Sequence, residues 1–129
     1  IILIPNRKKI TDITELNSRD QILLMREIVF CSNLMKKEFK TSKLNIEKIG
    51  NIVPQLHIHI IARSKKDSSW PLSVWAVKRK NYSKNFLLNQ ILKLKKLFYY
   101  FFNCYHKFGI IIFIIFRIFN IIIFIIFRN

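Results

Sequence analysis

The sequence predicts one modest domain in which strands and helices are mixed, followed by an apolar tail of different composition. Two observations carry this prediction. Residues 52–63 alternate polar and apolar side chains as a half-buried strand does, and residues 17–40 repeat apolar side chains at helical spacing. A chain of 129 residues has room for at most one such domain with appendages.

The first predicted element is a short buried strand over Ile1–Pro5, which is almost entirely apolar. The chain opens directly on this strand and without Met, so we expect a fragment whose upstream strands are missing. A polar connector over residues 7–16 follows it.

A long amphipathic helix is predicted next, ending near Lys40. Asn17 or Ser18 can cap its first turn, and Asp20 suits the positive end of the helix dipole. Apolar residues then recur at helical spacing and predict the face that packs on the core. They are Leu23, Leu24, Ile28, Cys31, Leu34, Met35 and Phe39.

Two further strands are expected after this helix. Residues 44–46 form the first, and Gly50 marks a turn or a close backbone approach before the second, which we predict from Ile52 to Arg63. Pro54 lies inside that second strand, and since proline cannot donate to the hydrogen-bond ladder, it predicts an edge position or a bulge.

The alternation within residues 52–63 sorts its side chains onto two faces. Gln55, His57, His59 and Ile61 share one face, and Leu56, Ile58 and Ile60 share the other. Histidines two residues apart lie roughly 6.6–7 Å apart at the backbone. That spacing suits two groups acting on one phosphate, or two ligands of one metal. No further His, Cys or close acid pair supplies an obvious third ligand, so we expect no metal site.

The second half of the chain changes composition after Lys96. Residues 78–97 form a basic C-terminal helix region, with a helix expected over residues 85–97 on Leu87, Leu88, Ile91, Leu92 and Leu94. Residues 98–129 form a low-complexity apolar tail. Its stretch over 110–127 is long enough for a membrane span of about 17–25 residues. A frameshift or read-through artefact, a membrane anchor and a buried helix of a soluble protein remain the alternatives.

Net charge and cysteine content limit the partners and the cellular compartment that the sequence predicts. The formal net charge is +16, but the basic residues are scattered, so no specific nucleic-acid binding is expected. The 2 cysteines form no pairing motif and no signal peptide opens the chain, which predicts a reducing, cytoplasmic setting. Attachment to a membrane through residues 110–127 is the alternative.

Residues 51–63, Asp67–Pro71 and Val74-Trp75 resemble the histidine triad (HIT) family of nucleotide hydrolases and transferases, in its bacterial members with Gln at the first triad position. Leu3–Pro5 and Thr14–Leu16 also follow the order of that family. The resemblance implies an α+β domain over residues 1–77, with an antiparallel sheet, a long helix crossing one face and a homodimer. The family's first strands precede Ile1 in the usual layout.

The resemblance also implies a mechanism without a cofactor. His57, in the central triad position, attacks the α-phosphorus and forms a nucleotidyl-histidine, which water then hydrolyses. A neutral imidazole is a good nucleophile near pH 7 if its other nitrogen carries the proton. His59 can donate to the oxygens where charge develops. Gln55 replaces the first histidine and can donate a hydrogen bond, but it cannot shuttle a proton.

The family pattern further places nucleotide contacts at Asn45, Gly50, Asn51 and Trp70. Two of these residues have a plain structural alternative: Asn45 as an ordinary turn residue and Trp70 as packing after the sheet. Glu47 stands where glycine is common. The expected substrates are dinucleoside polyphosphates or nucleoside phosphoramidates. The alternative is a nucleotide-binding protein without significant turnover, attached to a membrane or not.

Overall fold

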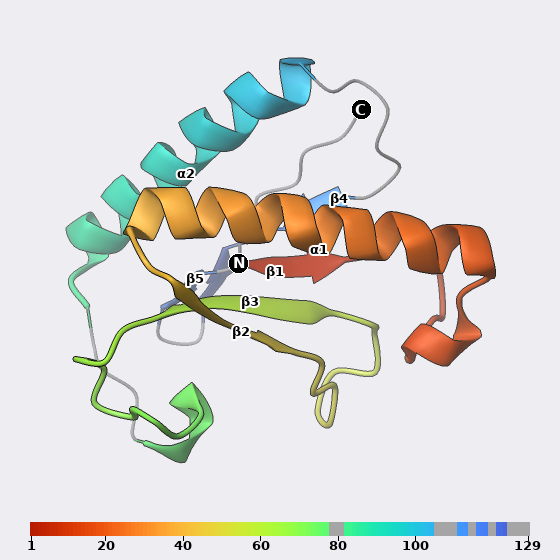
Figure 1. Cartoon of the computed structure of the whole chain (residues 1–129), viewed down its shortest axis with the longest axis horizontal. Coiled ribbons are helices and arrows are strands. Elements are labelled where there is room, and N and C mark those ends of the chain that lie inside the picture. The colour runs from red at the N-terminus through yellow and green to blue at the C-terminus, as the bar shows by residue number, and fades with distance from the viewer. Residues whose placement is uncertain (78–81, 105–110, 114–115, 119–120, 124–129) are drawn as a thin grey trace.

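A computed structural model describes residues 1–77, 82–104, 111–113, 116–118 and 121–123 (Figure 1). Two helices and two short 3-10 turns accompany the strands. In chain order the elements are β1 (Ile2–Ile4), η1 (Ile13–Glu15), α1 (Ser18–Phe39), β2 (Lys43–Glu47), β3 (Ile58–Arg63), η2 (Val74–Ala76), α2 (Lys84–Cys104), β4 (Ile111–Phe113), β5 (Phe116–Ile118) and β6 (Ile121–Ile123).

The strands form an antiparallel sheet in the order β2-β3-β1-β4, and β5 and β6 pair separately. Helix α1 packs against one face of this sheet and runs above β1 and β3 in the view of Figure 1. The predicted α+β class, with an antiparallel sheet and a long crossing helix, is therefore confirmed.

The core lies between α1 and the sheet, and α2 closes one side of it. Side chains from β1, α1, β3 and α2 form one apolar cluster, whose buried members include Leu3, Leu24, Ile28, Cys31, Leu34, Met35, Leu56, Ile58, Ile60, Ile91 and Leu94. The predicted alternation is confirmed, because Leu56, Ile58 and Ile60 are at most 2% exposed while the residues between them are only partly buried.

The helix start is as predicted. Asn17 Oδ1 accepts a hydrogen bond from the backbone N–H of Asp20 at 2.9 Å, which satisfies one of the open donors of the first turn. Asp20 also receives two hydrogen bonds from Arg7. The helix ends at Phe39, and Lys40 follows in the left-handed region with φ of 48°.

Four residues expected in the core are less buried than predicted. Leu23 is half-buried, and Phe39, Leu88 and Leu92 are exposed. Phe39 is the last residue of α1, where the left-handed Lys40 turns the chain away. Leu88 and Leu92 lie one turn apart on α2, while Leu87, Ile91 and Leu94 take the face that packs on the core.

The histidine strand is shorter than predicted. It begins at Ile58 and not at Ile52, so Pro54 lies in the preceding loop and requires neither an edge position nor a bulge. The strand in fact lies between β2 and β1. Before it, Gly50 has a φ of 69°, and the N–H of Leu56 donates to the carbonyl of Ile10. That N–H therefore bonds the N-terminal connector and no neighbouring strand.

The predicted span over residues 110–127 falls partly outside the described residues. The described parts of it are the short strands β4, β5 and β6. Within the described residues, no helix has both the length and the apolar character that crossing a bilayer requires.

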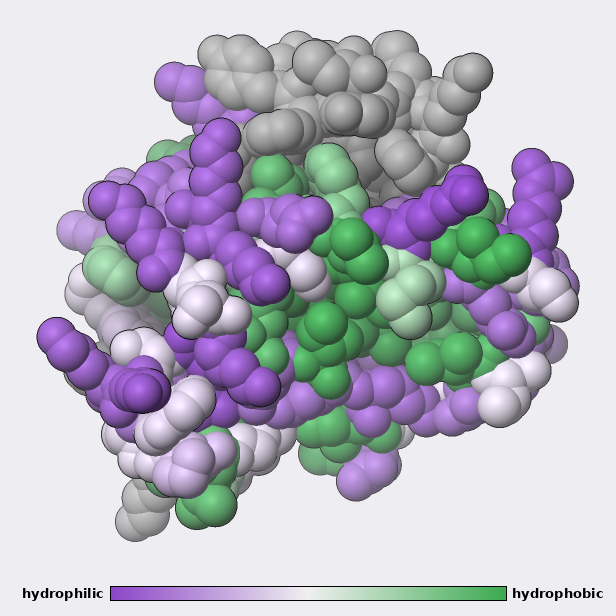
Figure 2. All heavy atoms as spheres, in the orientation of Figure 1, coloured by the Kyte–Doolittle hydropathy of each residue, from purple (hydrophilic) through white to green (hydrophobic). Residues whose placement is uncertain are grey.

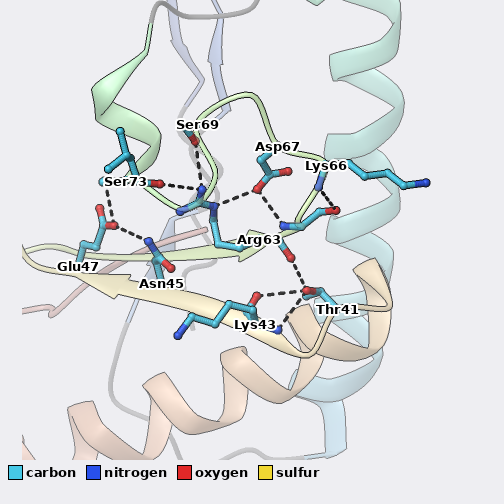
Figure 3. A network of polar contacts seen from close by, with 11 residues as sticks. Thr41, Lys43, Asn45, Glu47, Arg63, Lys66, Asp67, Ser69 and Ser73 are labelled. Carbon is cyan, nitrogen blue, oxygen red and sulfur yellow. Dashed lines mark hydrogen bonds and ion pairs between the residues drawn. The ribbon is translucent and has the colours of Figure 1, made fainter.

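A buried arginine holds the segment that follows β3 (Figure 3). Arg63 is 2% exposed, and its guanidinium donates to Asp67 Oδ2, Ser69 Oγ and the carbonyl of Leu72 at 2.9–3.1 Å. Its own carbonyl accepts from Thr41 Oγ1. One side chain thereby ties residues 67–72 to the end of the sheet.

The buried core also contains a carboxyl group, that of Glu27. Glu27 is 3% exposed, and neither of its side-chain oxygens has a hydrogen-bond partner in the described part of the chain. Burial raises the pKa of Glu27 from its ordinary value of 4.5 to about 8. The folded chain therefore keeps this proton at neutral pH, whereas the unfolded chain releases it.

Replacing Arg63 with Met should lower the free energy of unfolding by about 3 kcal/mol, because Asp67, Ser69 and Leu72 lose their shared donor. Urea unfolding at neutral pH measures this. The matched control is Arg26→Met on the exposed side of α1, which should stay within about 0.5 kcal/mol of the parent chain. Equal stability of the two variants would contradict the bracing role of Arg63.

Glu27 predicts stability that decreases as pH rises. Its contribution is fully present below its unfolded pKa of 4.5 and is lost as pH rises through the folded value of about 8. The unfolding free energy should fall by up to about 1.4 kcal/mol per pH unit within that window. Urea unfolding across the window should show a flatter profile for Glu27→Leu, with Glu38→Leu on the same helix as control. A slope unchanged by Glu27→Leu would rule out this origin.

Candidate functional site around His57 and His59

The two histidines lie on the face of the sheet opposite α1. His57 immediately precedes β3 and His59 is its second residue, while Ile58 between them points into the core. The neighbouring strand places Glu47 opposite His59, with their Cα atoms paired in the antiparallel register. Both imidazoles are half-buried, so this face combines a packed underside with an open polar surface.

The contact of His57 Nδ1 defines the tautomer of this ring. Nδ1 lies 2.6 Å from the carbonyl oxygen of Gln55. A carbonyl oxygen can only accept, so Nδ1 must carry the hydrogen in this contact. In the neutral imidazole, Nε2 then has a free lone pair. The local backbone turn at Gln55–His57 thus prepares one ring nitrogen as a nucleophile or ligand.

Three aromatic rings follow one another across this surface. The His57 and His59 ring centroids are 5.0 Å apart at an interplanar angle of 69°. The His59 centroid is in turn 5.3 Å from the Trp75 ring, at 83°. Burial lowers the pKa of His59, with smaller contributions from His57 and the amino group of Ile1, while Glu47 opposes them. Near neutral pH, His59 therefore favours its uncharged form.

Glu47 connects this surface to the segment after the sheet. Its carboxylate accepts hydrogen bonds from Asn45 Nδ2 at 3.1 Å, Ser73 Oγ at 3.2 Å and Trp75 Nε1 at 2.5 Å. The first two contacts are drawn in Figure 3. These bonds bring η2 over the edge of β2, which is how Trp75 reaches His59.

The remaining predicted site residues divide into two groups. Gln55 and Asn45 lie near the histidines, but their amides are engaged elsewhere: Gln55 Nε2 donates to the carbonyl of Arg7 at 3.3 Å and Asn45 donates to Glu47. Gly50 and Asn51 occupy the turn before β3, where Asn51 is exposed.

Trp70 lies beside the Arg63 network. The Arg63 guanidinium is 5.7 Å from its ring centroid, in the geometry of a cation–π contact. Trp75, by contrast, lies against His59. Sequence reasoning therefore missed Glu47 and Trp75 as neighbours of the histidines. The period of the strand could have found Glu47, since Asn45 and Glu47 share a face.

The described residues hold no group of three or more His, Cys, Asp and Glu side chains arranged for a metal ion. One imidazole offers a free lone pair, the other a hydrogen-bond donor, and both open onto the same side of the sheet.

Comparison with known proteins agrees with this geometry. A family model described as the HIT domain matches residues 1–66. No curated protein sequence matches the chain. Several crystal structures are similar to it, three of which are described below. A histidine triad protein from Bradyrhizobium japonicum is 40% identical, with a TM-score of 0.67, over 74% of this chain and 72% of that one.

The second similar structure is a histidine triad (HIT) protein from Sinorhizobium meliloti, 36% identical with a TM-score of 0.64 over 70% and 67% of the two chains. The third, from Marinobacter aquaeolei, is a histidine triad protein with 35% identity and a TM-score of 0.68, over 74% and 71%. Family model, sequence identity and fold agree over the half of the chain that carries the histidines. The chain belongs to the histidine triad family.

Proposed function

We propose that the chain is a nucleotide hydrolase that cleaves at the α-phosphate of a dinucleoside polyphosphate or a nucleoside phosphoramidate. The observation that carries the proposal is the contact between His57 Nδ1 and the Gln55 carbonyl. It directs the free lone pair of Nε2 away from the backbone. Family membership supports the coarser class, a nucleotide-binding hydrolase or transferase.

The proposed reaction proceeds in two displacements. The Nε2 lone pair of His57 forms a bond to the α-phosphorus, and the bond from phosphorus to the leaving oxygen or nitrogen breaks with its electron pair. The leaving group takes a proton from water or from a solvent acid. A water molecule then attacks the phosphorus and releases a proton to the solvent. The P–N bond breaks with its electrons returning to Nε2, and the nucleoside monophosphate leaves.

His59 and Gln55 have supporting roles in this proposal. His59 lies on the same face as His57 and can donate a hydrogen bond to a non-bridging phosphate oxygen, where negative charge grows in the transition state. The Gln55 side chain cannot exchange a proton in this range of pH. Its backbone carbonyl serves instead, by orienting the nucleophilic ring.

We assign nucleotide binding to the turn before β3 and to the segment after it. Gly50 and Asn51 supply backbone and side-chain donors in the turn, and Asn45 and Trp70 complete the proposed contacts. The functional unit in this proposal is residues 1–77, which contains every one of these side chains. Residues 78–97 and 98–129 lie outside it.

His57→Ala should abolish both turnover and the covalent intermediate, because it removes the Nε2 lone pair that the proposal assigns as the nucleophile. The measurement is release of labelled monophosphate from a dinucleoside tetraphosphate, together with trapping of the labelled protein after rapid acid quench. His59→Ala should lower turnover by roughly 10²-fold, as expected for one lost transition-state donor, and still form the intermediate.

His106→Ala is the matched control for this experiment, since it removes a histidine outside the proposed unit and should leave turnover unchanged. Turnover retained by His57→Ala would overturn the nucleophile assignment. Nucleotide binding by the parent chain without any monophosphate would favour the alternative, a binding protein without significant turnover.

We also propose that the chain forms a homodimer, as the family resemblance implies. Helix α1 exposes Ile22, Met25 and Val29 at 52–59% on its outer side, at the spacing of one helix face. Figure 2 shows apolar surface on the face of the molecule that is turned toward the viewer, where α1 lies in Figure 1. Exposed apolar side chains gathered in this way are typical of protein–protein contacts.

Met25→Glu should shift sedimentation toward the monomer at a fixed protein concentration, because it places a charge within this outer face of α1. The control is Leu88→Glu, which adds the same charge at an exposed apolar position of α2. A parent chain that sediments as a monomer at every concentration, or equal effects of both variants, would contradict the proposed interface.

A further inference from the structure

Glu47 places a carboxylate beside a histidine that the proposed function assigns to phosphate. Its Cα pairs with that of His59 across β2 and β3. Directly opposed side chains in such a pair lie on one face with Cβ atoms about 4.5–5.5 Å apart. A negative charge at this position repels a phosphate group. The carboxylate is therefore compatible with the proposed site only if it also contributes to the site in another way.

The carboxylate is held by neutral donors. Trp75, Asn45 and Ser73 each donate one hydrogen bond to it, and within the described part of the chain no Lys or Arg forms an ion pair with it. Partial burial by itself would raise the pKa of Glu47, but these hydrogen bonds and the nearby His59 lower it. Glu47 is therefore ionised at neutral pH, and its charge is not cancelled by a cationic side chain.

The first consequence concerns Trp75. This side chain is 48% exposed, so packing alone restrains it weakly. Its indole N–H donates to Glu47 Oε2, and the same ring meets the edge of His59 at a centroid distance of 5.3 Å. The carboxylate thus determines which side of His59 the indole covers.

The second consequence concerns the charge of His59. The groups that face this imidazole are His57 from the start of β3, the amino group of Ile1 beside β1, Glu47 from β2 and the uncharged Trp75 from η2. Burial, His57 and the amino group all disfavour the protonated ring. Glu47 acts in the opposite direction, since an opposite charge favours the protonated form.

We propose that Glu47 is a positioning residue for the histidine pair, which holds Trp75 against the edge of His59 and supplies the negative charge that stabilises protonated His59. The inference rests on the proposed function, in which His59 donates a hydrogen bond to a non-bridging phosphate oxygen. A protonated ring makes a stronger hydrogen bond to such an oxygen than a neutral one does. Its physical content, the link between Glu47, Trp75 and the charge of His59, is measurable without turnover.

Three variants of the full chain separate charge from shape. Glu47→Gln keeps the size of the side chain and one acceptor oxygen but removes the charge, Glu47→Ala removes both, and Glu38→Gln removes a carboxylate on α1 as the matched control. In an NMR titration of labelled histidine rings, the pKa of His59 should be lower in Glu47→Gln than in the parent chain, because the opposite charge is lost. It should not change in Glu38→Gln.

Kinetics with a dinucleoside tetraphosphate supply the second measurement. The decrease of kcat toward high pH should move to lower pH in Glu47→Gln, by the same interval as the His59 titration moves in the NMR experiment. Glu47→Ala should in addition weaken the near-ultraviolet circular dichroism, because the Trp75 indole loses its hydrogen bond while Trp70 keeps its contact with Arg63. These changes in a pH profile and in a Trp signal are not expected of a merely structural residue.

An unchanged titration of His59 in Glu47→Gln, or a kcat profile that superimposes on that of the parent chain, overturns the proposal. If Glu47→Ala does not fold, Glu47→Gln alone decides between these results. If the parent chain releases no monophosphate but the His59 titration shifts as expected, the hydrolase assignment fails and the positioning role of Glu47 stands. The two failures are therefore distinguishable.

Discussion

The structure depends on the alternation of side chains along residues 55–61. Leu56, Ile58 and Ile60 are buried beneath α1, and this burial fixes which way the strand faces. A slip of one residue would turn the whole apolar set toward water and the histidines into the core. The same hydrophobic constraint that stabilises the domain therefore keeps His57 and His59 on the open face, side by side.

The segment after β3 is held at two separate points by charged residues of the sheet. Arg63 anchors residues 67–72 through a buried guanidinium, and Glu47 anchors Ser73 and Trp75 through its carboxylate. Neither anchor is an apolar contact, which is consistent with a segment that lies on the polar side of the sheet. Hydrogen bonds to charged groups are directional, so they place an exposed Trp side chain more accurately than packing would.

The spacing of residues in the sequence predicted much of the site, but it misplaced the start of the histidine strand and the burial of Phe39. The pairing of His57 with His59 follows from a two-residue period, which needs no tertiary information. The start of the strand was misplaced, because the loop residue Leu56 bonds to the carbonyl of Ile10, far away in the sequence. The exposure of Phe39 was misjudged for a related reason, since helical spacing does not report where the helix leaves the sheet.

The sequence by itself determined the long helix with its cap, the two faces of the histidine strand and the residues of the family motif. Each of these depends on neighbours within a few positions of one another. Only the tertiary structure decided that Trp75 and Glu47, 28 residues apart, meet beside His59, and that the carbonyl of Gln55 orients the ring of His57. The contact between Trp75 and Glu47 depends on how the segment after β3 folds back onto the sheet. The contact between the Gln55 carbonyl and the His57 ring depends on the local path of the backbone. Neither leaves a periodic pattern in the chain.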